Sequence, residues 1–299
     1  MQVPPLFELN HLFLNETTCI SFLFEKGIFY NQRDCPDCGT CMKLQQENSI
    51  FKCGKKTCRK ALSVKKHSFF GGHKLPCSKI LFLGYLWLCK VPISSAMLIS
   101  GHNSHTICDF YYYFRQLVSD SVEFDDTLIG GDGIIVEIDE SKLGKRKYHR
   151  GHRVDGVWIL GGVERTRDRK VFVVAIEDRT ADTLTRIIKE HVRPGSIIHT
   201  DMWKGYVQLH LDETFEHLTV NHSQNFKDPV TGVHINTIEG LWNGIKQQIK
   251  PRNRTVNGID EHLWEFIWRR KNKERFWEGF IEALKEIYYE ENLRYRMNL

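Results

Sequence analysis

The apolar positions in the second half of the chain fall into short runs and one helical stripe, which together predict a mixed α/β sheet. Runs rich in β-branched residues and bounded by glycine or charged turns are typical of buried strands. The two runs on either side of the basic turn at 165–169 are expected to form an antiparallel hairpin. In chain order, the pattern predicts strands at 134–138, 157–163 and 170–176, a helix at 181–191, and strands at 197–201 and 215–220. Alternation of this kind indicates a sheet with helices on its faces.

Helical patterns continue to the end of the chain. After a loop at 221–234, a helix is expected to start near Asn236. Two more helices are expected at 261–270 and 275–289, where aromatic residues share a face.

Helices are also expected before the sheet, at 80–89 and 94–100. After Gly101, a third helix has Ser104 as a candidate N-cap and an apolar face that reaches Val118. Two helices joined by a short glycine-containing turn are typical of a helix-turn-helix that enters a DNA groove, and equally of a small helical bundle. Periodicity does not separate these alternatives. The basic segment that precedes the helices favours DNA.

Two cysteine pairs near the N-terminus have the spacing of a structural zinc site. Two residues separate Cys35 from Cys38, and four separate Cys53 from Cys58. Four thiolates complete the tetrahedron that Zn²⁺ prefers. Cys41 is a rival ligand, because it follows Cys38 by three residues. The chain has nine cysteines, and this odd number fits a reducing compartment with a metal site better than a disulfide scaffold.

Charge is distributed unevenly along the 299 residues, although the formal net charge is only +5. Residues 31–66 hold nine Lys/Arg against three Asp/Glu, and residues 141–154 hold six against none. The segment 120–132 is acidic and is expected to be a solvated linker. The longest apolar run, 80–89, is too short to cross a bilayer. No secretory signal is visible. We therefore expect a protein that is not secreted, and that is nuclear in a eukaryotic host and cytoplasmic otherwise.

Three acidic residues that lie far apart in the sequence are candidate metal ligands. Asp139 is expected to end the first strand, Asp201 the fourth, and Glu239 lies in the first turn of a later helix. If the two strands are neighbours, both aspartates emerge at one end of the sheet, where the helix can bring the glutamate. Such a cluster is stable mainly when hard divalent cations neutralise it. Two Mg²⁺ or Mn²⁺ ions about 3.5 to 4 Å apart support in-line phosphoryl displacement, the chemistry of nucleases and strand transfer.

The blocks around these acids closely resemble the Merlin superfamily of DDE transposases, which includes bacterial insertion-sequence transposases. They read GIIVEIDESKLGKRKYHRG, WILGGVER, PGSIIHTDMWKGY and LTVNHSQNFKDPVTGVHINTIEGLWNGIK. The resemblance covers about residues 35–270. It implies an RNase H-like fold preceded by a zinc ribbon and a helix-turn-helix, and it implies a homo-oligomer. It also assigns the catalytic carboxylates to Asp139, Asp201 and Glu239.

The chain departs from the family pattern at two places. It has Ile235 and Asn236 where a Thr-Asn pair is usual before Thr-Ile-Glu, and Met202 where a small residue is usual. Neither change touches a carboxylate.

Basic residues after the first strand are candidate DNA contacts, because they could neutralise phosphates. A solvated charged turn is the alternative. The residues are Lys142, Lys145, Arg146, Lys147, Arg150 and Arg153.

Several residues near the acids have weaker assignments. His222 and His234 flank the loop before Glu239 and could orient a phosphate or a water, or simply be hydrogen-bonded within the loop. Glu137 and Glu140 are alternative acids that we expect to point away from Asp139. The expected role of Trp203 and Trp242 is to pack the core under the site.

Together these features predict a DNA transposase that binds the terminal inverted repeats of a transposon and target DNA, and then cuts and joins DNA with Mg²⁺. The alternatives are a domesticated, non-catalytic DNA-binding protein and an RNase H-like structure-specific nuclease. The expected segments are an N-terminal stretch at 1–30, a zinc ribbon at 31–66, a helical DNA-binding domain at 67–118, a linker at 119–132, an RNase H-like catalytic domain at 133–272 and a C-terminal helix at 273–299.

Overall fold

A computed structural model describes residues 3–45, 49–144, 156–221, 228–229 and 231–289. The chain forms two compact units, one of residues 1–121 with 272–299 and the other of residues 122–271. No helix in the described part is long and apolar enough to span a membrane.

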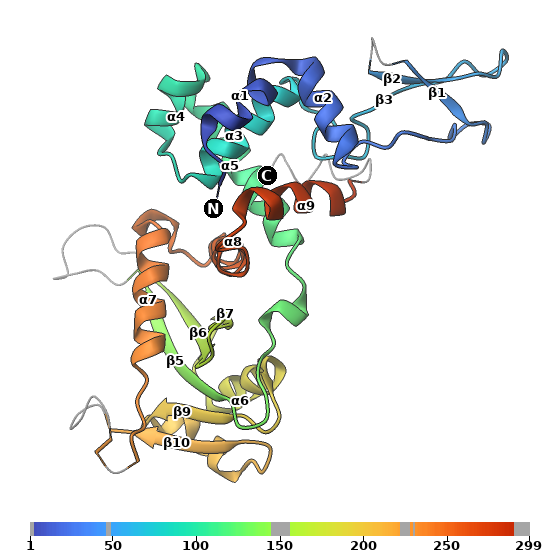
Figure 1. Cartoon of the computed structure of the whole chain (residues 1–299). Coiled ribbons are helices and arrows are strands. Elements are labelled where there is room, and N and C mark those ends of the chain that lie inside the picture. Colours follow the sequence, from blue (N-terminus) through green and yellow to red (C-terminus); the bar gives the residue numbers. More distant parts are fainter. Residues whose placement is uncertain (1–2, 46–48, 145–155, 222–227, 230, 290–299) are drawn as a thin grey trace. The chain divides into compact units, whose positions relative to one another are not determined.

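The first unit combines a small antiparallel sheet with helices (Figure 1). Strand β2 pairs with both of its neighbours. Gly84 allows two helices to approach closely, because a Cβ there would lie 2.8 Å from the ring of Phe280. The elements are β1 (Met42–Gln45), β2 (Ile50–Cys53), β3 (Ala61–Ser63), α1 (Leu6–Leu14), α2 (Glu16–Glu25), α3 (Cys77–Leu88), α4 (Ile93–Ser100), α5 (Ser104–Asp120) and α9 (Phe276–Glu286).

The turn between α4 and α5 differs in one detail from expectation. Gly101 ends α4 with φ +72°, as the predicted glycine stop requires. The N-cap of α5 is Asn103 rather than Ser104, since the Asn103 side chain accepts a hydrogen bond from the backbone N–H of Thr106 at 2.8 Å. Both residue types cap helices well, and the asparagine lies one residue earlier.

The second unit is built on a five-stranded mixed sheet with the order β10-β9-β5-β6-β7. The hairpin β6-β7 is antiparallel, as predicted. Strands β5 and β9 are parallel neighbours, which meets the condition under which Asp139 and Asp201 emerge at one end of the sheet. The expectation that the first strand ends near Asp139 is wrong, because β5 continues to Leu143 in its pairing with β6. The sheet strands are β5 (Ile135–Leu143), β6 (Val157–Glu164), β7 (Val171–Ile176), β9 (Ile197–Asp201) and β10 (Glu216–Val220).

Helical elements cover both faces of this sheet. One core joins it to α7 and α8, with Leu143 and Trp242 among its members. The other joins it to α6 and η3, with Val136 and Ile138 from β5. Figure 1 shows α7 running along β5 and β6. The remaining elements are η2 (Phe124–Thr127), β4 (Ile129–Gly130), α6 (Ala181–His191), β8 (Val192–Arg193), η3 (Lys204–Leu211), α7 (Asn236–Gln248), η4 (Pro251–Asn253) and α8 (Ile259–Lys271).

The fold class predicted from the sequence is confirmed. A mixed α/β sheet flanked by helices follows a small sheet with a four-cysteine cluster and N-terminal helices. The segment expected to be a solvated linker contains η2 and β4, and Ile129 in β4 is fully buried.

Candidate active site

Asp139 and Asp201 lie on neighbouring parallel strands. The last paired residues of β5 and β9 are Glu137 and His199, and Asp139 and Asp201 follow them by two residues on the same sides of these strands. The two aspartates are close enough for the charge of Asp201 to raise the pKa of Asp139. Beyond Glu137, β5 is paired with β6 alone, and β9 ends at Asp201. The structure therefore brings the two aspartates together where one strand ends and its neighbour continues.

The environment of Asp139 favours its protonated form. Burial, together with the negative charges of Glu140 and Asp201, raises the pKa of Asp139 to about 7. A hydrogen bond from the indole Nε1 of Trp242 to Oδ2 of Asp139, 2.8 Å long, acts in the opposite direction. A cation at this position would relieve the repulsion that raises the pKa.

A glycine on the neighbouring strand makes room for that indole. Gly161 pairs with Asp139 across the β5-β6 ladder, and a Cβ at Gly161 would lie 2.6 Å from the Trp242 ring. Trp242 was expected only to pack under the site. It is buried as expected, and it also contacts the candidate ligand directly.

Glu239 lies in the first turn of α7, three residues before Trp242. Residues three apart lie on neighbouring parts of a helix face, so Glu239 belongs to the same side of α7 as the tryptophan that touches Asp139. Its side chain is exposed. In the described part of the chain, the four N-terminal cysteines are the group whose ligand atoms all lie within 4.8 Å of one another, so the three acids do not meet that closely.

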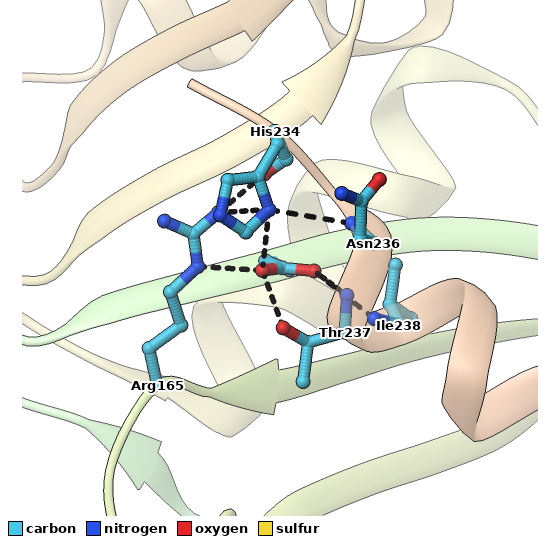
Figure 2. A network of polar contacts seen from close by, with 6 residues as sticks. Arg165, His234, Asn236, Thr237 and Ile238 are labelled. Atoms are coloured by element: carbon cyan, nitrogen blue, oxygen red, sulfur yellow. Dashed lines mark hydrogen bonds and ion pairs between the residues drawn. The ribbon is translucent and has the colours of Figure 1, made fainter. Parts of the chain in front are cut away.

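Glu137 shares the face of Asp139, which corrects the expectation that it points away. Side chains two residues apart on a strand lie on the same side. The Glu137 carboxylate is fully buried and accepts hydrogen bonds from the backbone N–H groups of Thr237 and Ile238, at 2.8 and 3.0 Å. Figure 2 shows Arg165 and His234 in the same network.

Glu140 lies on the opposite face, as predicted. Its carboxylate accepts a hydrogen bond from the hydroxyl of Tyr206 and pairs with Arg179 at 3.3 Å. Burial, followed by the charge of Asp201, raises the pKa of Glu140, and the bonds from Tyr206 and Arg179 oppose this rise. The Arg179 guanidinium lies over the rings of Trp158 and Trp203, at 3.7 and 4.8 Å from their centroids.

The candidate DNA contacts and the flanking histidines are only partly described. Lys142 is exposed on β5, with its ammonium 5.6 Å from the centre of the Trp158 ring. His234 accepts a hydrogen bond from Arg165 through its backbone oxygen, as part of the Glu137 network. Outside the described residues lie Lys145, Arg146, Lys147, Arg150, Arg153 and His222.

The four predicted zinc ligands converge in the first unit. Sulfur atoms of Cys35 and Cys58 lie 3.6 Å apart, and those of Cys38 and Cys53 lie 3.5 Å apart. A tetrahedral Zn²⁺ with Zn–S bonds of about 2.3 Å requires sulfur separations of about 3.8 Å, so the cluster fits zinc. The rival ligand Cys41 is exposed and is not part of the group.

The wide second cysteine pair has a simple structural reason. In the first turn the N–H of Gly39 bonds to the carbonyl of Cys35, and in the second the N–H of Arg59 bonds to the carbonyl of Lys55. The two turns are therefore alike, with φ +67° at Gly39 and φ +50° at Arg59. Cys53 lies before the second turn, at the end of β2, and still reaches the cluster.

Comparisons with known proteins found a matching domain family and a similar bacterial protein. Residues 117–271 match the ISXO2-like transposase domain. A Haemophilus influenzae protein described as an uncharacterized transposase-like protein is 34% identical over 123 residues, which cover 40% of this chain and 93% of the relative.

Proposed function

Because the chain belongs to the ISXO2-like transposase domain family, whose members carry out DNA phosphoryl transfer, we propose that it is an active DDE transposase. In this proposal it binds the terminal inverted repeats of a transposon, cuts DNA there and joins the ends to target DNA. The resemblance to the Merlin superfamily supports the same reaction.

The observation that supports the proposal most strongly is that Asp139 feels the charge of Asp201 and accepts a hydrogen bond from Trp242 of α7, the helix that also bears Glu239. Three carboxylates supply the hard oxygen donors that Mg²⁺ prefers. The raised pKa of Asp139 reflects burial and charge repulsion, both of which oppose ionisation when no cation is near.

Asp139, Asp201 and Glu239 are the residues that would hold two Mg²⁺ or Mn²⁺ ions. When bound, such ions activate the attacking oxygen and stabilise the leaving oxygen of a phosphodiester. The Glu239 side chain is exposed, so neighbouring side chains would leave it room to reach such an ion. Trp242 holds the Asp139 carboxylate in place, and the backbone N–H of Trp203 holds that of Asp201 at 3.0 Å.

DNA binding in this proposal belongs to the zinc-bearing sheet, the helices α3 to α5 and the basic segment that begins at Lys142. The lysines and arginines of residues 31–66 can neutralise phosphates, so end binding is expected to weaken steeply with salt. Joining two transposon ends needs at least two active sites, and we therefore propose a homo-oligomer.

The test is DNA cleavage by the purified chain on a duplex that carries the inverted repeats flanking its gene. Wild-type protein is expected to cut in Mg²⁺ and to join the cut ends to plasmid DNA. Asp139→Asn, Asp201→Asn and Glu239→Gln are expected to lose both activities and to keep DNA binding.

The same experiment separates the alternative functions. Binding without cleavage by the wild-type chain would indicate a domesticated DNA-binding protein. Cleavage of branched or hybrid substrates without joining would indicate a structure-specific nuclease. Cleavage that survives all three substitutions would refute the proposed site.

A further inference from the structure

The buried carboxylate of Glu137 is the N-terminal cap of the helix that carries Glu239. Helix α7 lacks a side-chain cap from the residue that precedes it, Ile235. Glu137 replaces that cap from β5, because its Oε2 accepts the N–H groups of Thr237 and Ile238. Its Oε1 accepts the Thr237 hydroxyl at 2.8 Å. A carboxylate at this end of a helix is also favoured by the helix dipole.

An arginine compensates the buried charge. The Nε of Arg165 lies 2.5 Å from Oε1 of Glu137, and the same guanidinium bonds to the backbone oxygen of His234, just before the helix (Figure 2). The nearby ring of His199 does not share this role at neutral pH, because burial and the charge of Arg165 lower the pKa of His199 to about 4. A buried ion pair of this kind holds its elements in one arrangement when its other hydrogen bonds are also made.

The acceptor capacity of Glu137 is used within this network. Two N–H groups occupy one of its oxygens, and a hydroxyl and a guanidinium occupy the other. A carboxylate offers about four lone-pair sites, so Glu137 cannot also ligate a cation without giving up bonds to α7. This separates Glu137 from Asp139, although the two share one face of β5.

Strand β5 therefore holds α7 at two points. Glu137 holds its first residues, and Asp139 holds Trp242 one turn later. Glu239 lies between these two attachments in the sequence of α7. The strand that supplies one candidate ligand thus fixes the helix that supplies another.

We propose that Glu137, with Arg165, is a positioning residue that holds the first turn of α7, which carries Glu239, against the strand that carries Asp139, and so tunes the affinity of the acidic site for divalent cations. This inference rests on the proposed function, because it takes Glu239 to be a ligand. Because Glu137 acts by holding α7 in place, its loss should change both the metal affinity of the acidic site and the order of the first turn of α7.

The experiment uses the full-length, zinc-loaded chain and two measurements that do not depend on cleavage. One is Mn²⁺ affinity by calorimetry, and the other is hydrogen exchange of the amides of residues 236–242. Glu137→Gln is expected to weaken Mn²⁺ binding about 10- to 100-fold, the usual range for residues that orient ligands, and to speed exchange at Thr237 and Ile238.

Glu164→Gln is the matched control. Glu164 is also a buried carboxylate, but it accepts hydrogen bonds from the N–H of Gly130 and the hydroxyl of Thr166, and neither residue belongs to α7. It is expected to lower stability without changing Mn²⁺ affinity or exchange in α7. Equal effects of Glu137→Gln and Glu164→Gln, or wild-type values for Glu137→Gln, would overturn the proposal.

Two further variants keep the outcome decisive. If Glu137→Gln does not fold, Thr237→Val removes only the hydroxyl bond, and it is expected to weaken Mn²⁺ binding about 2- to 10-fold. Unchanged affinity would then overturn the proposal. Glu239→Gln separates the two levels of inference. If Glu239→Gln cleaves DNA like wild type, the proposed active site is wrong. If Glu239→Gln is inactive but Glu137→Gln keeps wild-type Mn²⁺ affinity and amide exchange, only the positioning role is wrong.

Discussion

Trp242 donates a hydrogen bond from its indole to the carboxylate of Asp139, and the glycine opposite Asp139 on β6 leaves the space that the indole fills. This relationship connects the sheet to α7 at the point where the candidate site is assembled. The position of the Asp139 carboxylate on β5 therefore depends on Gly161 of β6.

Gly161→Ala is expected to displace the indole, because the added methyl would lie 2.6 Å from it. The free energy of unfolding should fall by about 1 to 3 kcal/mol, as for other overpacked cores. Cleavage should fall more than DNA binding. Denaturant unfolding and cleavage assays measure the two effects, and Gly240→Ala, with open space around its Cβ position, is the control.

The raised pKa of Asp139 predicts how stability depends on pH in metal-free protein. With a folded pKa of about 7, against 3.8 for the ordinary carboxyl, the folded state binds a proton more tightly than the unfolded state. This group therefore contributes stability at low pH that is lost as pH rises toward 7. Asp139→Asn should raise the free energy of unfolding at pH 8 by more than about 1 kcal/mol, since each pKa unit corresponds to about 1.4 kcal/mol.

The same measurement at pH 4 provides the internal control. At pH 4 the Asp139 carboxyl of the wild type is protonated in the folded state. The gain in free energy of unfolding from Asp139→Asn should therefore be smaller than at pH 8. A benefit that is equal at both pH values would show that Asp139 is ionised at little cost. Saturating Mn²⁺ at pH 8 should reverse the order and make the wild type more stable than Asp139→Asn.

The four-cysteine cluster predicts about one zinc per chain. Removing the metal with a chelator should disorder the small sheet, because structural zinc contributes directly to folding free energy. Cys58→Ser should lose the metal, whereas Cys41→Ser should retain it. Elemental analysis and hydrogen exchange of residues 31–66 measure both, and zinc loss in Cys41→Ser would place that residue among the ligands.

Arg59 occupies a left-handed backbone position that the first cysteine turn fills with Gly39. Arg59→Gly should relieve this strain and raise the free energy of unfolding of the zinc-loaded protein by about 0.5 to 1 kcal/mol, after the added entropy of the unfolded chain is counted. Arg59→Ala should give no gain. If Arg59→Gly lowers the free energy of unfolding, the contacts of the arginine side chain contribute more to stability than the backbone strain costs.

Much of the second unit follows from local sequence pattern. The β-branched runs predict the strands closely, and the helical pattern at 181–191 predicts α6. The four sequence blocks around the acids identify the fold family. Pattern did not show where β5 ends. The acids after Ile138 suggested a strand end, yet pairing with β6 extends the strand to Leu143. Pairing partners that are distant in the sequence decide such boundaries.

The role of Glu137 was missed for a different reason. The sequence alone could have predicted that Glu137 and Asp139 point to the same face of the strand, because they are two residues apart. The contact of Glu137 with the start of α7 could not be predicted, since a hundred residues of chain separate Glu137 from Thr237. The cluster of Cys35, Cys38, Cys53 and Cys58 was predicted from the sequence, because their spacing encodes a local geometry.

The central claim is that Asp139, Asp201 and Glu239 bind shared divalent cations. A crystal structure of the full-length chain with Mn²⁺ and an oligonucleotide bearing a transposon end tests it most directly, through anomalous scattering at the manganese edge. The account predicts two manganese peaks whose protein ligands are Asp139, Asp201 and Glu239. Manganese bound elsewhere, or manganese at the two aspartates without Glu239 among its ligands, would contradict it.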